Sequence, residues 1–210
     1  MHRPARTSII KLRRLITATT CVAVAFCCLL SLTAKASPYI SQQFNVKRGC
    51  SAPVIANPGF ETPAVPGSFT YFPSGFTWLP VGAGLMAVTG NASGWGNPNS
   101  PEGTQALILQ GGETASQSLS GFNKRNHYTL SVYAAQRACC GAPYNIQFQV
   151  ALDNTVLGTF TPVTGAYTFY SMSFTISSGV HLLKLSSVNP SQSDNSIFVD
   201  GLTLTATCPP

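Results

Sequence analysis

The sequence predicts an all-β protein, built as a single jelly-roll β-sandwich of two antiparallel sheets. After Pro53, short stretches of alternating apolar and polar residues follow one another, and Gly, Pro, Asn and Ser separate them. Strands of this length and spacing are typical of an antiparallel sandwich or barrel. No stretch after Pro53 shows the apolar period of an amphipathic helix. The two patterns together predict the fold class.

The clearest strand is the stretch NIQFQVAL at residues 145–152, in which the large apolar side chains fall on every second residue. Such side chains share one face of a strand, which is expected to look into the core. Asp153-Asn154 then predicts a hairpin turn into residues 155–160. A short apolar strand at Val54-Ile55 is expected to begin the domain, and Trp78 is expected in the core. Further strands are expected at Thr77–Leu79, Leu85–Val88, Gln105–Leu109, residues 127–137, residues 167–176, His181–Ser187 and Ile197–Thr205.

The charge distribution argues against a nucleic-acid partner. The chain has 210 residues and a formal net charge of +6, and its Lys and Arg residues number 12. Half of these basic residues lie within residues 1–36, a segment without Asp or Glu. The rest of the chain therefore carries six basic and six acidic residues and is neutral. Nucleic-acid binding needs a basic surface, so we expect no such partner.

Residues 1–36 have the layout of a secretory signal peptide. Basic residues extend to Arg14, an apolar run follows to Leu32, and Ala34-Lys35-Ala36 supplies a small–x–small cleavage site. A membrane anchor is the alternative, because the apolar run approaches the roughly 20 residues that a spanning helix needs. Cleavage would leave a leader at residues 37–52 and a sandwich domain at residues 53–207. The protein is then expected to be secreted or at the cell surface, without membrane contact after cleavage.

Four cysteines follow the signal segment: Cys50, Cys139, Cys140 and Cys208. An even number in an exported chain favours disulfides, while two adjacent cysteines suit tetrahedral zinc poorly. Cys50 precedes the first expected strand and Cys208 follows the last, and these strands usually lie side by side in a jelly roll. We therefore expect a Cys50–Cys208 disulfide, which leaves Cys139 and Cys140 to form a vicinal disulfide. The alternative pairs one or both of them elsewhere, including across chains.

Two carboxylates bracket the expected domain. Glu61 follows the first expected strand, and Asp200 interrupts the apolar last strand SIFVDGLTL. A buried carboxylate costs free energy unless it is paired or binds a cation, and Gly201 permits a bulge that would turn Asp200 toward a partner. A calcium ion between Glu61 and Asp200 would relieve their repulsion. The alternative is that Glu61 caps a turn and Asp200 accepts bonds from backbone amides.

Several motifs resemble galactose-binding-like jelly rolls, a superfamily that includes carbohydrate-binding modules appended to xylanases and related glycosidases. The bracketing motifs are NPGFE at residues 57–61 and FVDGLTL at residues 198–204. Between them, PEGTQALIL, SQSLSGF and YTLSVYAAQR resemble middle strands of these modules and of plant cell-wall proteins with this fold. The resemblance covers roughly residues 53–206. It implies a carbohydrate-binding-like domain and a structural calcium ion held by Glu61 and Asp200.

Long loops are expected at residues 62–75, 89–104, 137–145 and 188–196. A ligand site is expected on these loops, because sugar binding needs exposed aromatic faces and a few polar groups. In residues 89–104, Trp95 lies between two glycines and could stack on a sugar, with Asn97 beside it in sequence. The alternative is that Trp95 folds back and plugs the end of the sandwich. In residues 137–145, Arg137 and Tyr144 flank the adjacent cysteines and complete the predicted site.

The sequence lacks the known catalytic signatures, with no G-x-S-x-G, H-E-x-x-H or phosphate loop. His127 and His181 lie in strand patterns without an attached Ser or Asp motif, and Glu102 and Glu113 lack a glycosidase signature. The sequence therefore predicts that the chain is not an enzyme but an exported carbohydrate-binding protein. The alternative is a structural or adhesive matrix protein that uses the same fold for protein contacts.

Overall fold

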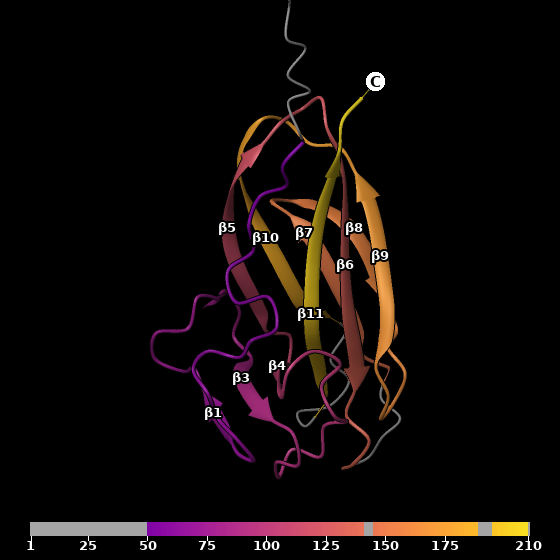
Figure 1. Cartoon of the computed structure of the whole chain (residues 1–210). Coiled ribbons are helices and arrows are strands. Elements are labelled where there is room, and N and C mark those ends of the chain that lie inside the picture. The colour runs from indigo at the N-terminus through magenta and orange to yellow at the C-terminus, as the bar shows by residue number, and fades with distance from the viewer. Residues whose placement is uncertain (1–49, 141–144, 189–194, 210) are drawn as a thin grey trace, which may run out of the picture. The chain divides into compact units, whose positions relative to one another are not determined.

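The computed structural model describes residues 50–140, 145–188 and 195–209. The predicted signal peptide, the leader up to residue 49 and Tyr144 lie outside these ranges. The described residues form eleven strands and confirm the all-β prediction (Figure 1). Their bounds are β1 Phe69–Tyr71, β2 Leu79–Pro80, β3 Leu85–Gly90, β4 Gln105–Gln110, β5 Thr114–Phe122, β6 His127–Gln136, β7 Gln147–Leu152, β8 Thr155–Phe160, β9 Thr168–Phe174, β10 Gly179–Val188 and β11 Ser196–Thr207.

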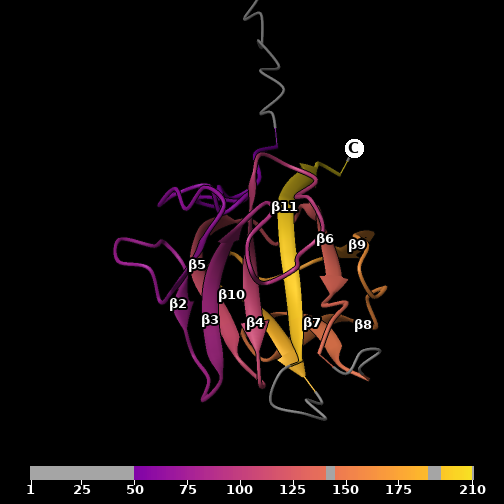
Figure 2. The ribbon, with the colours of Figure 1, turned by 90° about the horizontal axis from the view of Figure 1, so that it is seen from below.

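The strands form the two antiparallel sheets that the sequence predicts. A six-stranded sheet has the order β1-β3-β4-β11-β6-β9, and a five-stranded sheet has the order β2-β5-β10-β7-β8. Figure 2 shows β11 between β4 and β6, so the last strand is central in its sheet. The expected hairpin at Asp153-Asn154 joins β7 to β8. In the described part of the chain, no helix is long and apolar enough to cross a membrane.

The main core lies between the sheets and follows the alternation seen in the sequence. Every second side chain of β6 from Tyr128 to Ala134 is buried, as is every second one from Ile146 to Leu152. Trp78 is 1% exposed and belongs to this core, as predicted. Burial of these side chains is the main favourable contribution to folding, at about 25 cal/mol per Å² of apolar surface.

Two expectations about the first part of the domain are wrong. Val54-Ile55 is not a strand, because the backbone of Ala56 is bound instead by the side chain of Gln117, at 2.8 and 3.0 Å. Conversely, Phe69–Tyr71 forms edge strand β1 within a segment expected to be a loop. The sequence did not predict this strand, because it has only three residues and lies among Gly and Pro residues that indicate a loop. Its pairing with β3 defines it.

The segment around residue 58 nevertheless lies beside the last strand, since Leu202 N donates to Pro58 O at 3.1 Å. The Cα atoms of Cys50 and Cys208 are 5.5 Å apart and their sulfur atoms are at bonding distance. This separation is normal for a disulfide, so the structure accommodates the predicted Cys50–Cys208 bond. Cys139 and Cys140 are exposed, and a vicinal bond between them stays a prediction.

Candidate functional site

The outer face of the six-stranded sheet is unexpectedly apolar. Strand register places Ala87, Ile108, Phe198 and Ala135 side by side across β3, β4, β11 and β6. These four residues form a second buried cluster together with Trp95, which comes from the loop at residues 91–104. The sheet is therefore buried on both faces here, with one face covered by a loop.

Trp95 packs against this face and is shielded from solvent. It is 5% exposed, and Arg137 Nε donates to its carbonyl oxygen at 3.0 Å. The Arg137 guanidinium carbon lies 4.6 Å from the Trp95 ring centroid. The rings of Phe69 and Tyr71 meet the Trp95 ring in T-shaped arrangements, at centroid distances of 5.9 and 6.3 Å. This is the geometry of the plug alternative, and stacking of a ligand on Trp95 stays a prediction.

Asn97 builds the same loop. Its side-chain oxygen accepts bonds from Thr89 Oγ1 at 3.1 Å and Ser93 Oγ at 3.0 Å, and its amide nitrogen donates to Gly90 O at 3.4 Å. The structure thus brings Trp95 and Arg137 into contact and gives Asn97 a role within the loop. A ligand-binding role for these three residues stays a prediction, and Tyr144 lies outside the described residues.

A hollow of about 270 Å³ opens beside Trp95. Phe69 and Tyr71 form its exposed rim, at 37% and 47% exposure, and Gln110 and Arg137 contribute polar atoms. The exposed aromatic rings that line this hollow therefore come from edge strand β1 rather than from Trp95.

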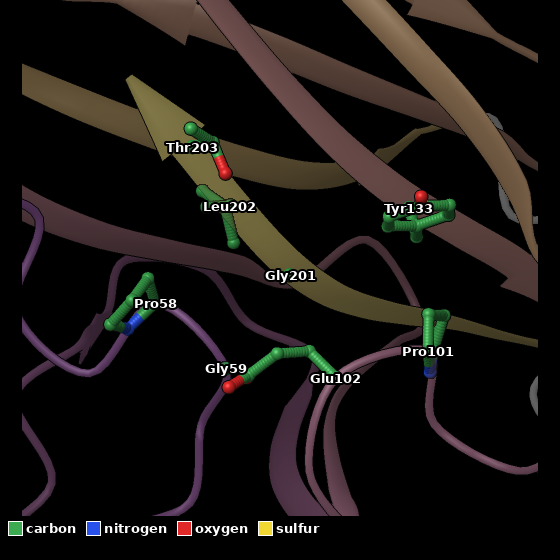
Figure 3. A pocket seen from close by; sticks show the side chains of 8 residues that line it. All are labelled: Pro58, Gly59, Pro101, Glu102, Tyr133, Gly201, Leu202 and Thr203. Carbon is green, nitrogen blue, oxygen red and sulfur yellow. The ribbon is translucent and has the colours of Figure 1, made fainter. Parts of the chain in front are cut away.

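A larger pocket of about 400 Å³ lies where the NPGFE turn, the 91–104 loop, β6 and β11 meet. The register of β11 shifts between Asp200 and Thr203, and Gly201 adopts a φ of 58°, so the bulge that this glycine permits is present. Figure 3 shows the Glu102 side chain reaching toward Gly59. The residues that line the pocket are Pro58, Gly59, Pro101, Glu102, Tyr133, Gly201, Leu202 and Thr203.

Asp200 lies directly beside this pocket, between Gly201 of the lining and Tyr133 of the neighbouring strand. The side chain is 0% exposed, and its two oxygens accept Gly201 N at 2.7 Å and Glu102 N at 2.9 Å. Removal from water raises the pKa of Asp200 to about 7, the charges of Glu102 and Glu61 add to the rise, and the two amide bonds oppose it. The Asp200 carboxyl therefore holds its proton more tightly than a solvent-exposed aspartate does.

Glu61 joins the NPGFE turn to the end of the covering loop. Its Oε1 accepts the backbone amides of Thr104 and Gln105, both at 2.8 Å, and its Oε2 accepts Thr104 Oγ1 at 3.1 Å. Both Glu61 and Asp200 therefore accept hydrogen bonds from backbone amides, as expected if they have structural roles without a metal ion. Within residues 50–140, 145–188 and 195–209, no group of three or more His, Cys, Asp or Glu is placed to hold a metal ion. The side chains as they stand do not converge on calcium, which stays a prediction.

Tyr167 is a further group near Asp200 that the sequence did not single out. Burial raises the pKa of its hydroxyl, and the charge of Asp200 raises it further, while the Ser100 hydroxyl opposes the rise. The Tyr167 and Ser100 hydroxyls are both buried without a hydrogen bond of normal geometry to a described residue. No local motif marks either residue. Tyr167 lies in the connection between β8 and β9 and Ser100 in the loop between β3 and β4, so only the fold brings them together.

A second constellation missed from the sequence surrounds His181. Its Nδ1 lies 2.7 Å from Asp153 Oδ2, and its Nε2 lies 3.0 Å from Ser177 O and 3.3 Å from Ser177 Oγ. The hydrogen bond to Asp153 is the main cause that raises the pKa of His181. A carbonyl oxygen can only accept, so Nε2 donates to Ser177 O and is not a base for the Ser177 hydroxyl. These contacts tie two turns to β10 rather than forming a catalytic triad.

Glu102 and Glu113, which the sequence suggested as conceivable catalytic acids, occupy different environments. Glu102 lines the pocket, whereas Glu113 is 1% exposed and its Oε1 accepts the amide of Thr114 at 2.9 Å. Close contacts with Gly82 and Gly84 surround Glu113, since a Cβ at either glycine would overlap it or its backbone. Glu113 lies in the turn between β4 and β5 rather than among the residues that line the pocket.

The two-sheet architecture defines the structural class of the protein, a jelly roll with the fold of carbohydrate-binding modules. The structure of TmCBM61 in complex with beta-1,4-galactotriose has this fold, with a TM-score of 0.50, 16% identity, and coverage of 75% of this chain and 100% of that chain. The predicted resemblance to carbohydrate-binding modules is therefore confirmed at the level of fold. No curated protein matches the sequence significantly.

The chain belongs to the HpiC1-like family, described as HpiC1 cyclase, whose model matches residues 51–205. A cyclase from Fischerella sp. TAU has a TM-score of 0.55 at 17% identity, with coverage of 75% of this chain and 98% of that chain. The Stig cyclase Fisc from Fischerella sp. TAU has a TM-score of 0.53 at 19% identity, with coverage of 75% and 99%. The expectation that the chain is not an enzyme is therefore wrong, because its family is a cyclase family. The sequence misled because none of the catalytic signatures considered belongs to this chemistry.

Proposed function

We propose that this protein is a cyclase that closes a ring in an unsaturated small molecule by proton transfer from Asp200. The observation that carries this proposal is a buried carboxyl group with a pKa of about 7, adjoining a pocket of about 400 Å³. A general acid works best when its pKa lies near the working pH, and perturbed carboxyl groups beside pockets are candidates for that role. Membership of the HpiC1-like family supports the proposal.

The chemistry can be balanced without a further reagent. Asp200 gives its proton to a carbon–carbon double bond, and a second double bond of the substrate attacks the resulting cation to form the ring bond. Loss of a proton from the cyclised cation back to the carboxylate regenerates Asp200, so the product is an isomer of the substrate. The Tyr133 ring, which lines the pocket, would stabilise the positive charge through its face.

Access to Asp200 sets a condition on this mechanism. The carboxyl is fully buried, and the backbone amide of Glu102 occupies Oδ2. The substrate therefore reaches the acid only when the Pro101-Glu102 segment moves away from β11. Leu202 and Pro58 then keep water from the cation, because they form apolar walls of the same pocket.

The test is isomerisation of a panel of alkenyl compounds by the purified protein, followed by liquid chromatography and mass spectrometry. We expect a product with the substrate's mass and a new retention time, and a rate that falls as the pH rises through about 7. Asp200→Asn should reduce the rate by about 100-fold or more, since general acids contribute that much. Asp153→Asn is the matched control, because Asp153 contacts His181 and does not line the pocket. Equal rates for the wild type and Asp200→Asn would contradict the proposal.

Carbohydrate binding is a second candidate function, favoured by the exposed rings of Phe69 and Tyr71 beside Gln110. Aromatic faces next to a side-chain amide suit the apolar and hydroxyl sides of a sugar. A glycan array should then give binding that Tyr71→Ala removes. Phe169→Ala is the control, because Phe169 is 54% exposed and does not line this hollow. Unchanged binding by Tyr71→Ala would contradict this second function.

Export remains part of the proposal. The basic and apolar segments of residues 1–36 and the Ala34-Lys35-Ala36 site support cleavage and a secreted or surface location. Sequencing of the mature amino terminus tests it, and the expected first residue is Ser37. An intact Met1 in exported protein would contradict cleavage and favour the anchor.

A further inference from the structure

We propose that the pocket lined by Pro58, Pro101 and Tyr133 takes a positively charged organic ligand, an ammonium group carried on an apolar body. This inference deepens the proposed function and rests on it to the extent that this ligand is the substrate. It concerns recognition in the ground state, which can be measured without turnover.

The charges around the pocket are of one sign. Glu102 is the ionisable carboxylate among the lining residues, and the influence of Glu102 and Glu61 on Asp200 shows that all three acids lie within electrostatic range. None of the basic residues in the described ranges lines the pocket, and these are Lys124, Arg125, Arg137 and Lys184. A ligand that enters therefore meets a negative potential, which favours a cation and disfavours a carboxylate.

The Glu102 carboxylate is available to such a cation. In the described ranges, its side-chain oxygens take part in no hydrogen bond or ion pair, whereas Glu61 and Asp200 each accept bonds from backbone amides. The carboxylate lies against the backbone of Gly59, at the position that a Cβ there would occupy (Figure 3). Glu102 is thus placed at the pocket wall by a glycine that leaves room for it.

The walls match an apolar body rather than a bare ion. Pro58, Pro101 and Leu202 present hydrocarbon surface, and the Tyr133 ring packs 5.2 Å from the ring of Phe169. The face of an aromatic ring attracts an organic cation, and about 400 Å³ is a volume typical of a small-molecule site. Calcium would instead need six to eight oxygens at about 2.3–2.6 Å. The described residues hold no group of three acids, His or Cys arranged for a metal.

The experiment measures binding of three probes that share a phenyl group: 2-phenylethylamine, 2-phenylethanol and phenylacetate. Calorimetry at pH 7.5 and low salt should give about fivefold tighter binding of the amine than of the alcohol, the upper range for one solvent-accessible ion pair. Phenylacetate should bind most weakly. Glu102→Gln should make the amine and the alcohol equal while leaving the affinity for the alcohol unchanged.

A second variant keeps the charge and changes only its place. Gly59→Ala introduces a Cβ where the Glu102 carboxylate lies, so it should weaken the amine and spare the alcohol. Asp153→Asn, remote from the pocket, should leave all three affinities unchanged. Equal binding of amine and alcohol by the wild type overturns the inference. Displacement of the amine by calcium, with calcium affinity lost in Glu102→Gln, also overturns it and identifies a metal site.

The outcome is separable from that of the proposed function. Amine preference without any isomerised product contradicts the cyclase and leaves the recognition of cations standing. Turnover of a neutral alkene by a protein without amine preference contradicts the recognition of cations and leaves the cyclase standing.

Discussion

Asp200 and His181 are both buried ionisable side chains in central strands, one in each sheet, yet their surroundings differ. Asp200 lies near two further acids, Glu61 and Glu102, and within the described part of the chain its carboxyl oxygens accept hydrogen bonds from backbone amides alone. His181 faces the carboxylate of Asp153 at 2.7 Å and donates from its other nitrogen to Ser177 O. A buried ionisable group without a counter-charge lowers the stability of the fold, whereas a paired one adds to it. Under the proposed function, Asp200 is kept for proton transfer at a cost in stability, whereas His181 and Asp153 hold the fold together.

The largest effect should come from the pH dependence of Asp200. Its folded pKa of about 7 exceeds the ordinary value of 3.8, so the folded state holds the proton more tightly than the unfolded state. The free energy of unfolding should therefore fall as the pH rises from about 4 to about 7, by up to about 4 kcal/mol. Urea unfolding of metal-free protein across this range measures it. Asp200→Asn should remove this part of the slope, and an unchanged slope would show that Asp200 is already ionised at low pH.

Calcium would remove the difference between the two groups. A bound cation would give Asp200 a positive partner, just as the Asp153 carboxylate gives His181 a negative one. The sequence predicts that Glu61 and Asp200 hold this ion. If so, calcium at 100 times its dissociation constant should raise the free energy of unfolding at pH 8 by about 2.7 kcal/mol. The increase should be smaller at pH 5, where Asp200 is protonated, and absent in Asp200→Asn. A melting temperature that calcium leaves unchanged at pH 8 rules out the ion and leaves Glu61 as a cap.

Asp200 and the His181–Asp153 pair also differ in how well the sequence could predict them. Asp200 was recognisable, since a carboxylate within an apolar strand is a local signal. The pairing of His181 with Asp153 was not, because it depends on how the turn between β7 and β8 meets β10. Alternation predicted the inner faces of the strands for a similar reason, because that pattern too can be read within a single strand.

The pocket itself was beyond a reading of local pattern. It forms where four segments meet that are far apart in the sequence. That a loop covers the outer face of the six-stranded sheet was not predicted either. The continuous apolar run from Ala106 to Leu109 could have indicated this covered face, because a strand buried on one face alternates and this one does not. Trp95, expected to stack on a sugar or to plug the sandwich, covers that run. The proposed catalytic role of Asp200 was not predicted from the sequence, because proton transfer by one buried acid needs no recognisable motif.

The bulge at Gly201 is the next way to test the comparison. Its φ of 58° favours glycine, and a Cβ there would lie 3.2 Å from the Tyr133 ring. Gly201→Ala should destabilise the fold by about 1–2 kcal/mol, the cost of a left-handed residue with a side chain. It should also move the amide that bonds to Asp200 and so alter the pH dependence of stability. Thermal unfolding with the same pH series checks both, and a loss of stability with an unchanged pH slope would separate the bulge from the acid.

The smallest effect should come from His181. Its pKa is raised by Asp153, so its contribution is fully present below the ordinary value of 6.5 and is lost as the pH rises through the folded value. Asp153 is 50% exposed, and solvent screening limits the pair to about 0.5–1 kcal/mol. His181→Gln should therefore lower stability at pH 5.5 and leave it nearly unchanged at pH 8.5, with ring-closing activity unaffected at both. Asp153→Asn should reproduce this pattern, because it removes the carboxylate that pairs with the protonated His181 ring. Equal losses at the two pH values would mean that packing of the ring, rather than its charge, holds the two turns to β10.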